Sequence, residues 1–232
     1  MALYHKLKEN GESVSGSYHS SPKKLSHEYK FDINADAVPG DISNADIVLL
    51  NLPPSKITSE EHFDSFLNQL SHKEIIFISS TSVYGNQGDV DETTLPLPET
   101  ENGKRLLNWE QKIQNLFKRY QIIRSAGQYG GERHPGKFLS GREDIQGGMD
   151  IINLISQKDL IDIIIKAMGL KESSIINAVN THHPVKKDFY TKYCIHNHLP
   201  LPHFKTEVST NSKKITTKYK EFEISTNLIK GH

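Results

Sequence analysis

The sequence predicts an α/β protein with a doubly wound parallel sheet. Short runs rich in β-forming residues alternate with amphipathic helical stretches, which is the pattern of a parallel sheet covered on both faces. Residues 74–78 form a continuous apolar run after the first glutamate, as is typical of a strand buried on both faces. Residues 58–70 instead place Phe63, Phe66 and Leu70 on one stripe of a helix. Together these observations predict the fold class.

Local signals place each element in order. The opening helix stops at Asn10-Gly11, because glycine takes the left-handed C-terminal conformation at low cost. Ser21-Pro22 begins a short helix, with serine as the cap and proline in the first turn, and Thr58 has capping-box spacing to Glu61. The expected helices are residues 2–10, one from residue 21, 58–70, 104–120, 160–168 and one beyond Pro184, and the expected strands are residues 13–17, 29–33, 46–50, 74–78, 121–124 and 174–178.

The composition limits the classes of partner. The chain has 232 residues, of which 35% are hydrophobic, enough for the core of one compact domain. Lys plus Arg and Asp plus Glu both number 28, so no excess charge favours nucleic acid or an acidic membrane surface. We therefore expect a small-molecule substrate as the partner.

The single cysteine and the N-terminal residues predict a cytoplasmic protein. Cys194 has no second cysteine with which to form an internal disulfide, which fits a reducing cytosol. Charged residues occur at His5, Lys6, Lys8 and Glu9, where a secretory signal would be apolar, and no apolar run has the length of a transmembrane helix.

Hydroxyl side chains follow the apolar strand directly. Residues 79–82 read Ser-Ser-Thr-Ser, so they lie at the carboxyl end of the strand over residues 74–78. In open parallel sheets, ligands bind beyond the carboxyl ends of the strands. The sequence therefore predicts a ligand site at this point.

The segment around these hydroxyls resembles a known family. Residues 77–85 read Phe-Ile-Ser-Ser-Thr-Ser-Val-Tyr-Gly, and Asp91-Glu92 follows them. They closely resemble the Ser-Ser-x-x-Val-Tyr-Gly and downstream acidic pattern of extended short-chain dehydrogenases/reductases, such as nucleotide-sugar epimerases and dehydratases. Further similar segments are residues 124–130, 153–160 and 177–180, in the family's order, and residues 49–54 and 133–142, which are similar to an atypical bacterial subgroup of NAD(P)-dependent epimerases.

The resemblance implies a Rossmann-like fold and an NAD(P)-dependent epimerase, dehydratase or reductase acting on a nucleotide sugar or related small molecule. Residues up to about 150 would form the nucleotide-binding core, and residues 151–232 the last strand and a small C-terminal substrate lobe of the same domain. Ser80 matches the family's hydroxyl that hydrogen-bonds substrate, and Ser82 matches a neighbouring hydroxyl position. The resemblance places these residues on the nicotinamide side: Asn51, Pro53, Ser79, Ser80, Ala126 and Gly127.

The sequence departs from the family at its start. Family members have a first strand and a glycine-rich turn before the opening helix, where backbone amides hold the cofactor pyrophosphate. Here residues 1–3 already lie within that helix. We expect a sheet without its first strand and glycine-rich loop, through either a start codon assigned too late or a genuine truncation. A genuine truncation would expose strand edges, so it predicts a partner strand or a homodimer.

A second departure concerns the catalytic pair. The family uses a tyrosine base and a lysine four residues later, because a nearby ammonium lowers the pKa of the phenol. Asn102 and Leu106 occupy these positions, and neither can do that chemistry. Tyr84 is an alternative acid/base, although its ring can equally brace the loop, and Lys104 or Lys112 could supply positive charge. A catalytically impaired pseudoenzyme, acting as a binding or regulatory module, is therefore the alternative function.

The end of the family's second strand bears on the cofactor. NAD-preferring members have an acidic residue there for the ribose hydroxyls. This chain has Ser17, His19 and Ser20, followed by Lys23 and Lys24. Hydroxyls and cations suit a 2′-phosphate, so NADP is favoured over NAD. In the alternative interpretation, Ser20 simply caps the next helix.

Histidines and the cysteine near the C-terminus do not predict a metal site. His182-His183 is followed by Cys194, His196 and His198. On a helix, Cys194 and His198 would share a face, but two ligands do not close a tetrahedral site. We expect no metal.

Overall fold

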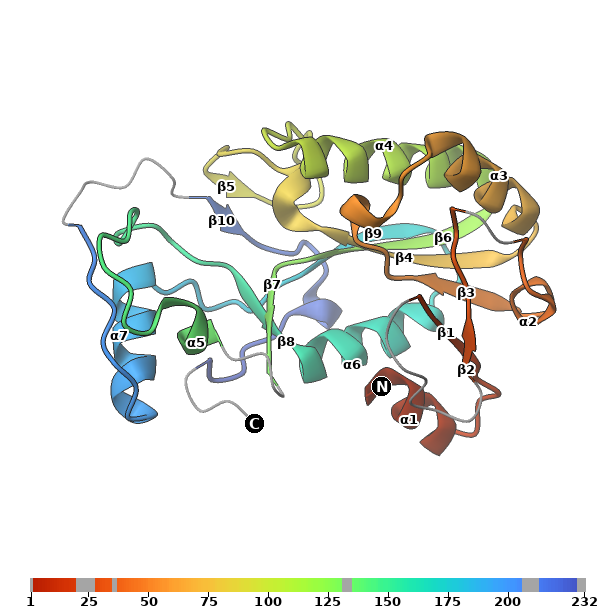
Figure 1. Ribbon diagram of the computed structural model, residues 1–232. Coiled ribbons are helices and arrows are strands. Elements are labelled where there is room, and N and C mark those ends of the chain that lie inside the picture. The colour runs from red at the N-terminus through yellow and green to blue at the C-terminus, as the bar shows by residue number, and fades with distance from the viewer. Residues whose placement is uncertain (1, 20–27, 35–36, 131–134, 206–212, 229–232) are drawn as a thin grey trace. The chain divides into compact units, whose positions relative to one another are not determined.

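The computed structural model describes residues 2–19, 28–34, 37–130, 135–205 and 213–228 (Figure 1). The helix predicted from Ser21 lies outside these residues. The α-helices are α1 (Ala2–Glu9), α2 (Gly40–Ser43), α3 (Glu60–Leu70), α4 (Glu101–Leu116), α5 (Pro135–Leu139), α6 (Gln157–Met168) and α7 (Lys186–His196). The strands are β1 (Gly16–Tyr18), β2 (Glu28–Lys30), β3 (Ile47–Leu50), β4 (Glu74–Ser80), β5 (Asp89–Val90), β6 (Arg119–Ser125), β7 (Gly127–Tyr129), β8 (Leu154–Ser156), β9 (Ser174–Ala178) and β10 (Lys214–Ile215). Short 3-10 turns are η1 (Pro54–Lys56), η2 (Thr81–Val83) and η3 (Lys220–Phe222).

The strands form one larger sheet and three pairs. The larger sheet has the order β3-β4-β6-β9, and β1-β2, β5-β10 and β7-β8 form separate pairs. The pair β3-β4 and all three separate pairs are parallel. The predicted α/β fold with parallel strands is therefore confirmed. Within the described residues, no ladder joins β1 or β2 to the larger sheet.

The chain forms two compact units that interleave along the sequence. The first unit comprises Met1–Ile78, Asn108–Ile122 and Ile164–Ser174. The second comprises Ser79–Leu107, Ile123–Ile163 and Ile175–His232. The chain passes from one unit to the other within β4, β6, α6 and β9 and within α4.

The core of the first unit is aromatic. Phe63 on α3 packs against Trp109 on α4 with ring centroids 4.3 Å apart, and Phe77 on β4 contacts the same indole at 6.2 Å. All three side chains are fully buried. The pairing of β3 with β4 sets Leu50 beside Phe77, so the carboxyl ends of these two strands are in register. The predicted helical stripe and apolar strand thus form this core.

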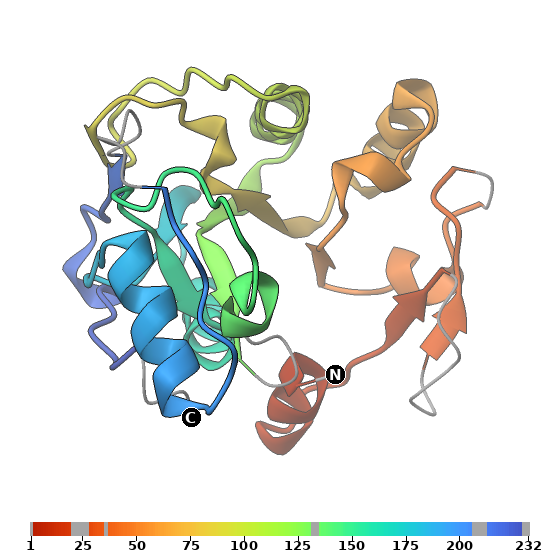
Figure 2. The same cartoon turned by 60° about the vertical axis from the view of Figure 1, so that its left-hand side comes forward.

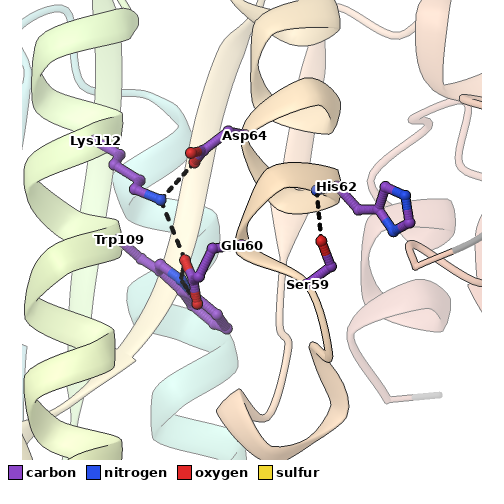
Figure 3. Close-up of polar contacts among 6 residues, drawn as sticks. All are labelled: Ser59, Glu60, His62, Asp64, Trp109 and Lys112. Carbon is purple, nitrogen blue, oxygen red and sulfur yellow. Dashed lines mark hydrogen bonds and ion pairs between the residues drawn. The ribbon is translucent and has the colours of Figure 1, made fainter.

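The cap of α3 differs from the prediction. Ser59, not Thr58, is the N-cap, and its Oγ accepts the backbone N–H of His62 at 3.2 Å (Figure 3). The backbone N–H of Thr58 donates instead to Asn34 Oδ1 at 2.8 Å. Two adjacent hydroxyl residues can both serve as caps, and the contact with Asn34 selects the second.

Helix α4 is shifted towards the N-terminus relative to the predicted range of 104–120. It begins at Glu101, where Thr100 Oγ1 accepts the backbone N–H of Gly103 at 3.1 Å. It ends at Leu116, because the next residues enter β6, where the backbone N–H of Tyr120 donates to Ser173 Oγ at 3.1 Å. Tyr120 continues the helical stripe in sequence, but pairing along the sheet decides its conformation.

The second unit has its own apolar cluster and contains the weakly patterned C-terminal residues. Tyr129, Leu154, Phe189 and Leu228 are buried together. The C-terminal segment, which we define as residues 213–228, begins with β10 paired to β5 and ends with Leu228 in this cluster. None of the helices described is long and apolar enough to span a membrane.

Candidate functional site

The predicted hydroxyls form a tight turn at the carboxyl end of β4. We call residues 79–85 the hydroxyl turn. Ser80 ends the strand, and its Oγ accepts the backbone N–H of Ser82 at 3.1 Å, which starts the 3-10 turn η2. This bond uses a lone pair of the Ser80 hydroxyl, so its O–H proton can still be donated to another group. Thr81 is buried and donates its hydroxyl proton to the carbonyl of Ser125 at 3.4 Å.

Tyr84 lies at the centre of a buried polar network. Its side chain is 1% exposed, and its hydroxyl donates to the carbonyl of Asp91 at 2.9 Å and lies 3.1 Å from Asn177 Oδ1. The buried guanidinium of Arg124 donates to the same hydroxyl at 2.6 Å. Burial raises the pKa of Tyr84 above its usual value, although the positive charge of Arg124 opposes this. The phenol is therefore neutral and surrounded by protein groups at ordinary pH.

Two glycines allow the chain to approach the hydroxyl turn closely. A Cβ on Gly103 of α4 would lie 2.5 Å from the carbonyl oxygen of Ser82. A Cβ on Gly85 would lie 2.4 Å from the carbonyl oxygen of Leu97. Both distances are shorter than real carbon–oxygen contacts, so side chains at these positions would push the turn away from its neighbours.

The acidic residue of the family pattern fixes the C-terminal segment. Glu92 accepts the backbone N–H of Asn177 at 2.7 Å and the hydroxyl proton of Thr217 at 2.6 Å through Oε1. Its other oxygen accepts the backbone N–H of Lys218 at 2.8 Å. Glu92 thus joins β9 to the C-terminal segment, which gives the downstream acidic pattern a structural reason.

Lys213 binds the hydroxyl turn from the C-terminal segment. Its Nζ donates to the carbonyl of Tyr84 at 2.7 Å and lies 3.4 Å from the carbonyl of Thr81. Burial lowers the pKa of Lys213. Sequence reasoning missed this residue, because it lies in a polar stretch without periodicity. The position of Lys213 directly before the two-residue strand β10 is a weak signal for a role of its side chain at the site.

Asn102 and Leu106, which the resemblance aligns with the family's catalytic tyrosine and lysine, both lie on α4. Asn102 is exposed and Leu106 is 5% exposed. Of the two lysines suggested as substitutes, Lys104 forms an exposed ion pair with Glu101 at 2.7 Å.

Lys112, the other suggested substitute, is held by two carboxylates of α3 (Figure 3). Its Nζ is 3.1 Å from Glu60 Oε2 and 2.5 Å from Asp64 Oδ1. Glu60 also accepts the indole N–H of Trp109 at 3.0 Å. Because both partners carry negative charge, they compensate the positive charge of the Lys112 ammonium, and these ion pairs join α3 to α4.

The cofactor residues predicted in the first unit are exposed at the ends of strands. Ser17 lies in β1, and His19 follows that strand with its Nε2 3.4 Å from Asp32 Oδ2. Asn51 and Pro53 follow β3 directly and are exposed. Ser20 lies outside the described residues.

Of the cofactor residues predicted in the second unit, Ser79 lies near the end of β4, and Ala126 and Gly127 follow β6. Ser79 is 4% exposed, and Ala126 is 5% exposed and donates its backbone N–H to the carbonyl of Ala178 at 2.9 Å. Gly127 begins β7 and is exposed, and a Cβ there would lie 3.1 Å from Leu154 Cδ2. Within this unit, the Thr81 hydroxyl donates to the carbonyl of Ser125, the residue before Ala126, so the hydroxyl turn contacts the end of β6.

The histidines near the C-terminus do not gather around a metal-sized site. Across the part of the chain that the structure describes, no group of three or more histidine, cysteine, aspartate or glutamate side chains has the geometry to hold a metal ion. Cys194 is buried on α7, and burial raises the pKa of its thiol.

Comparison with known proteins identifies the family. The protein YeeZ of Escherichia coli (strain K12) is 31% identical over 186 residues, which cover 75% of this chain and 67% of YeeZ. The chain belongs to the YeeZ family. No protein-family model matches the sequence.

Solved structures with the same fold include complexes with nucleotide sugars. MoeE5, in complex with UDP-glucuronic acid and NAD, has a TM-score of 0.78 at 18% identity, covering 99% of this chain and 91% of its own. The UDP-glucose 4-epimerase of Thermotoga maritima, with UDP-glucose, has a TM-score of 0.73 at 16% identity and the same coverage. These likenesses confirm the predicted Rossmann-like fold.

Proposed function

We propose that this member of the YeeZ family is a nicotinamide-dinucleotide-dependent epimerase, dehydratase or reductase that acts on a nucleotide sugar. The observation that carries the proposal is the braced hydroxyl turn at the carboxyl end of β4, where ligands bind in parallel sheets. MoeE5, which has the same fold, is a complex with NAD and UDP-glucuronic acid.

We assign the substrate contacts to Ser80 and Ser82 and a positioning role to Tyr84. Ser80 and Ser82 are half-buried, so their hydroxyls can reach a ligand, whereas Tyr84 is enclosed by Arg124, Asp91 and Asn177. A bound nicotinamide would accept or return a hydride. The chain's own part is to donate the Ser80 O–H to a substrate oxygen and to keep the turn in place.

The cofactor side fits either dinucleotide. The exposed residues Ser17, Asn51 and Pro53 offer hydroxyl, amide and backbone groups at strand ends, as a dinucleotide requires. The sequence favours NADP because the turn that follows Ser17 contains no carboxylate. Asp32 lies 3.4 Å from His19, however, and a negative charge at this distance would repel a 2′-phosphate. We therefore propose that removal of Asp32 raises the preference for NADP.

Titration of NAD and NADP into the full chain by calorimetry tests cofactor binding. The wild type should bind a dinucleotide, and Asp32→Asn should shift the affinity ratio towards NADP about tenfold, because the substitution removes a negative charge that repels a 2′-phosphate. Asp46→Asn is the matched control, since Asp46 is exposed in the same unit. Failure of the wild type to bind either dinucleotide would contradict the proposal.

A turnover assay tests the reaction itself. With NAD or NADP and a UDP-sugar such as UDP-glucose, product should form, and Ser80→Ala should lower kcat about 100-fold while dinucleotide affinity stays constant. Ser43→Ala, which removes an exposed hydroxyl from α2, should leave kcat unchanged. Tight dinucleotide binding without turnover of any nucleotide sugar would reject the enzymatic role.

A further inference from the structure

The C-terminal segment brings a positive charge to the hydroxyl turn. Lys104 and Lys112, which the sequence suggests as sources of positive charge, are paired with carboxylates of α3 and α4. Lys213 differs from them, because its ammonium is bound to the turn itself. Its Nζ donates to the carbonyl of Tyr84 at 2.7 Å and lies 3.4 Å from the carbonyl of Thr81.

The two carbonyls that Lys213 contacts belong to the two ends of one 3-10 turn. The carbonyl of Thr81 also accepts the backbone N–H of Tyr84 at 3.2 Å, which closes η2. Ser82 lies between these residues, and its own N–H donates to Ser80 Oγ at 3.1 Å. Hydrogen bonds from a charged donor are stronger than those from a neutral one, so loss of the charge should loosen the segment that orients both serines.

The main chain fixes the position of this lysine. The carbonyl of Lys213 accepts Nδ2 of Asn153 at 2.8 Å, and Oδ1 of the same asparagine accepts the backbone N–H of Ile215 at 2.9 Å. Between them, Lys214 donates its backbone N–H to the carbonyl of Gly88 at 3.0 Å. These bonds attach the start of β10 to the residues that precede β8 and β5. The reach of the Lys213 side chain to the turn is therefore set by the fold.

Burial and a carboxylate act in opposite directions on the charge of Lys213. The side chain is half-buried, and burial lowers its pKa, while the negative charge of Glu99 opposes this lowering. Lys213 therefore loses its positive charge at a lower pH than an exposed lysine does. The other ionisable groups on the surrounding elements are Asp89 on β5, Lys214 on β10, Tyr84 in the turn and His183 in the loop after β9.

We propose that Lys213 is a positioning residue whose positive charge keeps Ser80 and Ser82 in the orientation in which they bind the substrate. It acts through the backbone of the hydroxyl turn and not by contact with the reacting atoms. The role rests on the proposed function, because it concerns the same two hydroxyls. The site thus takes its positive charge from the C-terminal segment, whereas the resemblance places the family's lysine at position 106.

NMR of the full chain tests the coupling without any substrate. Uniform ¹⁵N labelling reports the backbone amides of Ser82 and Tyr84, and ¹³C,¹⁵N-lysine reports the side chain of Lys213, from about pH 8 to 11. We expect this side chain to titrate below the exposed lysines, and both amides to shift with the same midpoint. Amides that do not follow the titration of Lys213 would overturn the inference.

Two variants assign the titration to its source. In Lys213→Arg the lysine signal should vanish, and the shift of the two amides with it, because arginine stays charged throughout this pH range. Lys214→Arg is the matched control, since Lys214 is a half-buried neighbour on the same segment, and it should leave the titration unchanged. An amide shift that survives in Lys213→Arg would assign it to another group, such as the phenol of Tyr84, and would reject the coupling.

Turnover of UDP-glucose with NAD tests the consequence for the reaction. Lys213→Met should lower kcat about tenfold with a smaller change in KM, because slight misplacement of reacting groups reduces the rate. Lys213→Arg should restore most of kcat, and Lys214→Met should match the wild type. In a Ser80→Ala background, Lys213→Met should cause a smaller loss, because the lysine acts through that hydroxyl. Equal losses in both backgrounds would overturn the positioning role.

The two experiments separate this inference from the proposed function. Amides that follow Lys213, in a chain that turns over no nucleotide sugar, would support the inference about the turn and contradict the proposed function. Turnover at the same kcat in the wild type and in Lys213→Met would leave the proposed function standing and overturn the inference.

Discussion

Replacement of Tyr84 by phenylalanine tests whether this residue braces the site. The ring stays buried in the variant, so the change removes the hydroxyl and leaves the apolar packing of the side chain. The substitution removes the hydroxyl that accepts an N–H of the buried Arg124 guanidinium and that donates to the carbonyl of Asp91. Leaving a buried polar partner unpaired costs about 1–3 kcal/mol, and more when the partner is charged. We therefore expect a loss of about 2–3 kcal/mol in the free energy of unfolding.

Urea unfolding followed by far-UV circular dichroism measures this loss. Tyr190→Phe is the matched control, because Tyr190 is half-buried in the same unit, and burial alone raises the pKa of its phenol. The control should change the free energy of unfolding by less than about 0.5 kcal/mol. If Tyr84→Phe is as stable as the control, the network does not hold the hydroxyl turn, and the positioning role must be abandoned.

Two further predictions concern a close contact and a buried ring. Gly103→Ala should cost about 1–3 kcal/mol in the free energy of unfolding despite the better helix propensity of alanine, because its Cβ would meet the carbonyl of Ser82 at 2.5 Å. The control is Gly40→Ala, which has open space around it and should be neutral or stabilising. Equal effects of the two substitutions would contradict the close contact at Gly103. The lowered pKa of His183 means that the unfolded state binds more protons below pH about 6.5, so its contribution to stability is present above that pH and is lost as pH falls. Urea midpoints between pH 8 and 5 should fall less steeply for His183→Asn than for the wild type, and identical slopes would refute the shift.

Elements with strong local signals could be predicted from the sequence. The strand β9 has the bounds that were predicted, and the helical stripe of Phe63 and the apolar run around Phe77 form the core of the first unit. The strands β7, β8 and β10 have two or three residues each and were not predicted. Such strands have no periodicity of their own and are defined by the partner strand with which they pair.

The sequence predicts the hydroxyls of the candidate site but not the residues that hold them in place. The run of hydroxyls after a buried strand predicts that Ser80 and Ser82 lie at its carboxyl end, where the structure has them, while their roles in binding stay a prediction from the resemblance. Lys213 contacts residues of the hydroxyl turn that are 129 and 132 positions away in the sequence, and no local pattern reports such contacts. The sequence also contains no signal that Asp32, which follows β2, lies beside His19.

The brace around the hydroxyl turn does not depend on positions 102 and 106, with which the resemblance aligns the family's catalytic pair. Tyr84, Glu92 and Lys213 hold the turn through β9 and the C-terminal segment, and none of these bonds involves positions 102 or 106. Leu106 is 5% exposed, so a lysine there would place an ammonium among apolar neighbours at a cost of several kcal/mol. Restoring the family's tyrosine and lysine by substitution would therefore destabilise α4 before it could supply a base.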